Sequence, residues 1–75
     1  MSIKNSGELE FAIFCIENVA TFLGKEAQEV YKMLTQDTSI LSTYIVPEYE
    51  MLHTQSREYI VNDIVDVMRE SGVIG

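Results

Sequence analysis

The chain contains one cysteine and one histidine, the side chains that most often carry nucleophilic or metal chemistry. A cysteine nucleophile needs a base such as histidine beside it to take the thiol proton. Cys15 lies in the apolar run 11–16, where a free cysteine behaves as a small hydrophobic side chain and its thiol stays protonated. A structural zinc site needs four cysteine or histidine ligands, and this chain has two such residues. We therefore expect neither a Cys15–His53 catalytic pair nor a zinc centre.

Carboxylates are the remaining metal ligands that the sequence offers. Glu48, Glu50 and Asp63 could bind a cation through oxygen, but their spacing matches no calcium-binding loop. The four glycines are scattered near predicted helix ends and form no phosphate-binding loop. A chain of 75 residues also has little room for a substrate pocket. The sequence therefore predicts a protein that is not an enzyme and that binds no metal and no cofactor.

His53 stands immediately before a predicted helix. Thr54 or Ser56 suits the N-cap position of that helix, because a hydroxyl oxygen can accept a hydrogen bond from a free backbone N–H of the first turn. On one interpretation, His53 only fixes this loop by packing or hydrogen bonding. On another, His53, Gln55 and Tyr59 form a small partner-binding patch. The sequence leaves both interpretations open.

The elements that must position these residues are helices, because apolar residues recur every three or four positions. We expect helices over residues 9–23, 25–34, 40–45 and 56–71, with one short helical turn between residues 47 and 52. Ser6 suits the start of the first helix, and Gly24 and Gly72 suit the ends of the first and last. Pro47 should stop the third helix and push Val46 out of α geometry.

The fold class predicted is all-α, a compact bundle of four to five helices. The whole chain, residues 1–75, should form a single domain with a flexible N-terminus at residues 1–6. In the first helix we expect Leu9, Ile13 and Ile16 to face inward, and in the second Tyr31. The apolar arc of the first helix is too wide for one neighbour, so this helix is either central to the bundle or partly covered by another chain.

The chain is acidic, with five Lys and Arg against twelve Asp and Glu and a formal net charge of −7. Such a charge repels phosphate backbones and anionic lipid surfaces and favours basic protein partners. No apolar run approaches the roughly 20 residues that span a bilayer, and the N-terminus does not resemble a signal peptide. We therefore expect a cytoplasmic protein that binds neither nucleic acid nor membrane.

One alternative is a helix-turn-helix DNA-binding regulator. Residues 19–31 have the required outline of a helix, a glycine turn at Gly24 and a second helix. A recognition helix should present basic and amide side chains to DNA. The second helix instead carries Glu26 and Glu29 beside Gln28 and Lys32. An ordinary pair of packed helices explains the same residues more simply.

Residues 10–20 (EFAIFCIENVA), 29–34 (EVYKML), 44–55 (YIVPEYEMLHTQ) and 59–64 (YIVNDI) together resemble a family of short bacterial proteins classed as a domain of unknown function. The pairing of L-H-T-Q with Y-I-V-x-D-I is the most specific part of this resemblance. The family implies no established activity. Its members are similar to accessory proteins encoded near larger proteins with an ADP-ribosyltransferase-like domain, which implies an antitoxin-like or adaptor role.

The sequence thus favours a small acidic protein–protein interaction module. Its acidic surface would steer a basic partner, and apolar side chains at the edge of the core would anchor it. Phe14 and Tyr59 are the anchors expected, because helical geometry places both beside polar neighbours. The wide apolar arcs also predict a homodimer or a complex with another protein.

Overall fold

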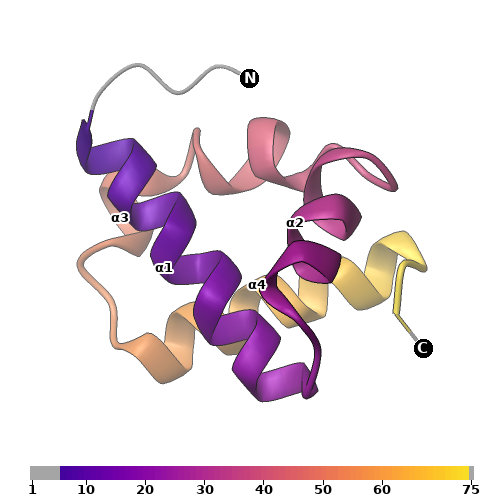
Figure 1. The fold of residues 1–75 in the computed structure, drawn as a ribbon. Coiled ribbons are helices and arrows are strands. Elements are labelled where there is room, and N and C mark those ends of the chain that lie inside the picture. The colour runs from indigo at the N-terminus through magenta and orange to yellow at the C-terminus, as the bar shows by residue number, and fades with distance from the viewer. Residues whose placement is uncertain (1–5, 75) are drawn as a thin grey trace.

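The computed structural model describes residues 6–74. Its helices follow the order α1 (Ser6–Leu23), α2 (Ala27–Thr35), η1 (Leu41–Ile45), α3 (Tyr49–Leu52) and α4 (Arg57–Ser71) (Figure 1). The described residues contain no strand, which confirms the predicted all-α bundle of four to five helices. The expected flexible N-terminus falls outside the described residues except for Ser6, which begins α1 three residues before the predicted start.

The helix α1 is central to the bundle. It packs against α2 and also against α4, which it crosses in Figure 1. Every helix contributes to one hydrophobic cluster, and the described residues include no buried polar or charged side chain. The fully buried side chains come from four of the helices, and the largest of them are Leu34, Leu41, Ile45, Ile64 and Met68.

The buried face of α1 differs from the predicted one. Phe11 and Cys15 lie in the core, whereas Leu9 and Ile13 are 46% and 47% exposed. The difference arises from the packing of the other helices. Because α2 and α4 cover the side of α1 that is centred on Cys15 and Val19, the outer edge of the predicted apolar arc stays uncovered. The prediction that Leu9 and Ile13 face inward is therefore wrong.

The helix α2 begins at Ala27, two residues later than predicted. Glu26 precedes it, and the backbone N–H of Glu26 donates a hydrogen bond to the Glu29 carboxylate at 3.4 Å. The core receives Val30, Met33 and Leu34 from this helix. Tyr31 is exposed, which corrects the expectation that it packs inward.

The turn before Pro47 is π-helical. The backbone N–H of Val46 donates to the carbonyl of Leu41, five residues earlier, at 3.0 Å. The regular helix ends before Pro47, as predicted, but Val46 keeps α geometry (φ −66°, ψ −48°), so the prediction for Val46 is wrong. A wider turn moves the preceding carbonyls away from the proline ring and so relieves the clash that Pro47 would cause in an α-helix.

The helix α4 follows its predicted bounds closely. Ser56 is the N-cap, and the helix ends at Gly72, which adopts a left-handed conformation with φ 81°. Two N–H groups close this end: Gly72 donates to Arg69 and Val73 to Met68, which satisfies carbonyls of the last turn. Ile60, Ile64 and Met68 face the core, as predicted, with Val61 and Val65 beside them.

Candidate functional site

Cys15 lies in the core with no exposed surface. Burial raises the pKa of its thiol to about 12, so the thiol is neutral at physiological pH. His53, in contrast, is exposed on the surface. Among residues 6–74, no three His, Cys, Asp or Glu side chains lie close enough together to share a metal ion. Over the same residues, no helix is both long enough and apolar enough to cross a bilayer.

The ring of His53 stacks on the ring of Tyr49, with 4.7 Å between centroids and 21° between planes. Tyr49 in turn meets Phe11 edge to face at 5.4 Å. The backbone N–H of His53 donates to the carbonyl of Tyr49 and closes the end of α3. His53 therefore packs locally at the end of this helix, whatever else it contacts.

Phe14 lies at the other end of the same row of rings. It is only partly exposed, and its ring lies 6.4 Å from that of Phe11 in a stacked arrangement. It packs against the hydrophobic cluster. Much of the ring is therefore already covered by this chain, which leaves less of it for a partner than the sequence pattern indicated.

The two hydroxyl residues near His53 have different roles. Ser56 caps α4, because its Oγ accepts a hydrogen bond from the backbone N–H of Tyr59 at 3.1 Å. Thr54 points back toward α3 and donates from its hydroxyl to the carbonyl of Met51 at 2.8 Å. Of the two N-cap candidates, Ser56 is the one that the structure uses.

Gln55 and Tyr59 line one small hollow of about 170 Å³, together with Tyr44, Glu48, Met51 and Leu52. We call it the α3–α4 hollow. Its wall is fixed by a hydrogen bond from the Tyr44 hydroxyl to the Asp63 carboxylate. This bond, together with desolvation, raises the pKa of Tyr44 above its usual range. Of the predicted patch, the structure places Gln55 and Tyr59 in this hollow, whereas His53 does not line it.

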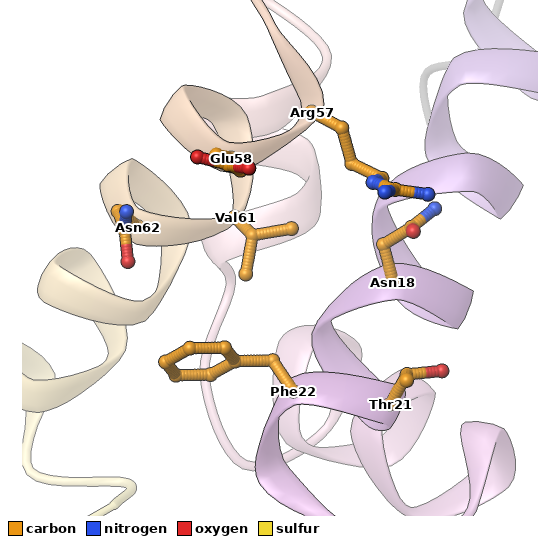
Figure 2. A pocket seen from close by; sticks show the side chains of 7 residues that line it. All are labelled: Asn18, Thr21, Phe22, Arg57, Glu58, Val61 and Asn62. Carbon is orange, nitrogen blue, oxygen red and sulfur yellow. The ribbon is translucent and has the colours of Figure 1, made fainter.

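A larger groove of about 490 Å³ lies between α1 and α4. Figure 2 shows Phe22 on α1 and Val61 on α4 on opposite sides of it. Phe22 is 55% exposed, whereas Val61 is buried at the base of the groove. The other lining side chains are polar and come from both helices: Asn18, Thr21, Arg57, Glu58 and Asn62. We call this site the α1–α4 groove.

The polar groups of the α1–α4 groove leave hydrogen-bonding capacity free. Asn18 uses one N–H of its side chain to donate to the carbonyl of Phe14 at 2.8 Å, which leaves its oxygen. Arg57 extends toward Asn18 (Figure 2). Among the described residues, Arg57 forms no ion pair; the salt bridge found there joins Arg69 and Asp66. The groove thus combines an apolar base with an unpaired cation and amide groups.

A third, more apolar depression of about 280 Å³ lies on the other side of α1, between α1 and α2. We call it the α1–α2 groove. Ile13, Ile16, Glu17, Ala27, Gln28 and Tyr31 line it. Its exposed apolar side chains are those that the sequence pattern assigned to the core.

Sequence reasoning therefore missed the two grooves beside α1. The sequence pattern does not single out Phe22, and it assigns Ile13 and Tyr31 to the interior. The signal that pointed to them was the width of that arc, which two neighbouring helices do not fully cover. Helical periodicity cannot show which edge of a wide arc stays open, because that depends on where the other helices pack.

Comparison with known proteins gives one relationship. No curated protein and no solved structure matches the chain. Residues 10–71 match the model of a family described as a protein of unknown function, DUF3791. This match spans most of the 75 residues and confirms the resemblance seen in the sequence. The chain therefore belongs to DUF3791, a family whose function is unknown.

Proposed function

We propose that this protein is a small cytoplasmic protein-interaction module and that its α1–α4 groove binds a segment of another protein. The observation that carries this proposal is Phe22, an aromatic side chain more than half exposed beside the largest of the three hollows described above. Exposing an aromatic ring to water is unfavourable, and such rings are enriched where proteins meet.

The groove suits binding by an inserted side chain. An apolar side chain of the partner would enter beside Phe22, remove its exposed face from water and rest against the buried Val61. Arg57 would donate hydrogen bonds to a carbonyl or carboxylate of the same segment, and Asn18 would accept one. Aromatic and arginine side chains are the types that most often dominate binding energy, in particular where surrounding contacts exclude water.

Net charge governs the approach of the partner. The formal charge of −7 attracts a basic protein at long range and raises the rate of encounter, whereas the contacts in the groove determine how long the complex lasts. The binding should therefore weaken as salt screens the charges.

The resemblance to accessory proteins supports a more specific proposal for the partner. The candidate is a protein with an ADP-ribosyltransferase-like domain encoded near this chain, toward which the module would act as an antitoxin-like protein or an adaptor. The presence or absence of such a neighbour in the genome is the least costly test of this part of the proposal.

No observation favours the helix-turn-helix alternative. The helix α2 would have to enter the major groove, yet its first turn carries Glu29 and its cap residue is Glu26. Phosphate contacts supply most nonspecific affinity for DNA, and acidic side chains oppose them. We expect no binding to duplex DNA at moderate salt in a fluorescence anisotropy titration. A sequence-specific complex at low micromolar protein would instead support the regulator.

The interaction proposal is tested by capturing the partner from native cells, purifying it and titrating it by calorimetry. We expect Phe22→Ala to weaken binding about tenfold or more, as for a typical hot-spot residue. Met51→Ala is the matched control, because Met51 is 71% exposed and lies outside the groove. It should leave the affinity within about twofold. Equal effects of the two variants, with unchanged melting temperatures, would contradict the assignment of the groove.

A further inference from the structure

The α1–α2 groove is separate from the α1–α4 groove. The two lie on opposite flanks of α1 and have no lining residue in common. One is lined mainly by polar side chains around Phe22 and Val61, whereas the other has Glu17 and Gln28 as its only polar lining residues. The two surfaces therefore suit different partner segments.

The shape of the α1–α2 groove suits a helix. On α1, Leu9 and Ile13 are four residues apart and so lie one above the other on the helix surface, and on α2 the same spacing aligns Ala27 and Tyr31. Leu9, Ile13 and Tyr31 are each more than 40% exposed. A depression lined by apolar side chains of two helices is the kind of surface in which an amphipathic helix places its apolar face.

The charges on the two sides of this groove differ. On α1, the exposed carboxylates of Glu10 and Glu17 lie three residues before and four residues after Ile13, so they follow the same side of the helix. On α2, the lining polar residue is the neutral Gln28, and Lys32 follows it by one turn. The α1 side is therefore acidic, whereas the α2 residues that line the groove are neutral.

We propose that the α1–α2 groove binds an amphipathic helix of another protein, and that this helix carries Lys or Arg on the flank that faces α1. Basic side chains there would pair with Glu10 and Glu17 while apolar side chains fill the depression at Ile13 and Tyr31. A second copy of this chain fits less well, because it would bring a further charge of −7 to the contact. This binding does not depend on the α1–α4 groove.

The test begins with a displayed library of helical peptides, roughly 18 residues or five turns long. Leucine is fixed along one face of each peptide, and the positions on both flanks are randomised. Selection on the full chain should enrich peptides with Lys or Arg on one flank only. No enrichment, an acidic bias or no charge bias would overturn the proposal.

The best enriched peptide is then titrated against variants by fluorescence anisotropy. We expect Ile13→Ser to weaken binding about tenfold or more, and Glu17→Lys to weaken it by a similar factor. A peptide with its basic flank changed to Glu should bind Glu17→Lys better than it binds the wild type. Met51→Ser, an exposed apolar residue outside this groove, should leave the affinity within about twofold. Equal losses in Met51→Ser and Ile13→Ser would overturn the proposal.

One further variant and one further measurement distinguish the α1–α2 groove from the α1–α4 groove and a partner helix from a second copy of the chain. Phe22→Ala should leave the affinity for the peptide unchanged, so that the proposals for the two grooves are tested independently. If Phe22→Ala abolishes binding of the peptide, the peptide occupies the α1–α4 groove and the proposal is overturned. Sedimentation velocity at tens of micromolar protein addresses the second copy. A dimer that Ile13→Ser converts to a monomer would assign the face to self-association instead.

Discussion

The loop at residues 52–56 and the two flanks of α1 present opposite cases. The loop contains the polar side chains that stand out in the sequence, and the structure uses three of them locally: His53 stacks on Tyr49, Thr54 donates to Met51 and Ser56 caps α4. The flanks of α1 contain ordinary apolar side chains that nothing in the described chain covers, above all Ile13 and Phe22.

The comparison shows that residues conspicuous in the sequence can be engaged by the fold itself, as His53, Thr54 and Ser56 are. In a small domain, the informative feature is apolar surface left over after the core is formed, because uncovered apolar area is what association can still remove from water. This is why we propose the interaction surfaces beside α1, while the predicted patch in the loop stays a prediction.

The largest effect should distinguish isoleucines of the core from those on a flank of α1. Ile64→Ala should reduce the free energy of unfolding by about 3 kcal/mol, because it leaves a cavity at a fully buried site. Ile13→Ala should change it by no more than about 0.5 kcal/mol, since Ile13 is 47% exposed and lies outside the core. Urea denaturation followed by circular dichroism measures both. If Ile64→Ala does not fold, Ile64→Val should still cost about 1 kcal/mol.

A smaller effect is expected from the bond between Tyr44 and Asp63. Tyr44→Phe should reduce the free energy of unfolding by about 1 kcal/mol at neutral pH. The folded chain raises the pKa of Tyr44 above the usual value of about 10, so above that pH the unfolded chain releases a proton that the folded chain keeps. The advantage of the wild type over the variant should therefore be complete below about pH 10 and decline above it. A constant difference up to pH 11 in urea titrations would argue against this bond.

The two hydroxyls of the loop should differ in a comparable way. Ser56→Ala should lower stability by about 1 kcal/mol, because an N–H of the first turn of α4 loses its acceptor. Thr54→Ala should cost no more than about 0.5 kcal/mol, because its hydroxyl only adds a bond to an exposed carbonyl. Thermal unfolding of the two variants measures this difference. A larger loss of stability in Thr54→Ala than in Ser56→Ala would mean that Thr54, and not Ser56, caps α4.

The smallest effect should come from His53. His53→Ala should reduce stability by about 0.5–1 kcal/mol through loss of the stack on Tyr49, whereas His53→Phe should retain most of it. Binding to the captured partner should fall only as far as the folded fraction falls. If a fully folded His53→Ala variant loses binding, then the predicted patch of His53, Gln55 and Tyr59 is a real contact surface.

The parts of the fold that follow from local chemistry could be predicted from the sequence. The periodicity of Ile60, Ile64 and Met68, the hydroxyl of Ser56 and the glycine at position 72 define α4 almost to the residue. The end of α1 at Gly24 follows from the same reasoning, since Gly24 has a positive φ of 67°. These signals depend only on neighbours within one or two turns.

The parts that depend on distant contacts could not be predicted. The exposure of Ile13 and Tyr31 depends on where α2 and α4 pack along α1. The partner of His53 is Tyr49, a ring on the short helix that no periodic pattern defines. Which of His53, Gln55 and Tyr59 line the α3–α4 hollow depends on the path of the loop between α3 and α4. A functional patch inferred from adjacent letters is therefore less secure than a helix inferred from them.

The π-helical turn at Leu41–Ile45 has a consequence for how the family can vary in length. Such a turn holds one residue more than an α-helical turn, and this extra residue sets the rotation of everything that follows. Loss of a single residue here would turn Tyr44 away from Asp63 and bring a carbonyl back against the ring of Pro47. Relatives that are one residue shorter in this segment are therefore expected to lack both the proline and the tyrosine–aspartate pair, so that a gap in an alignment and the substitutions that accompany it record a single event.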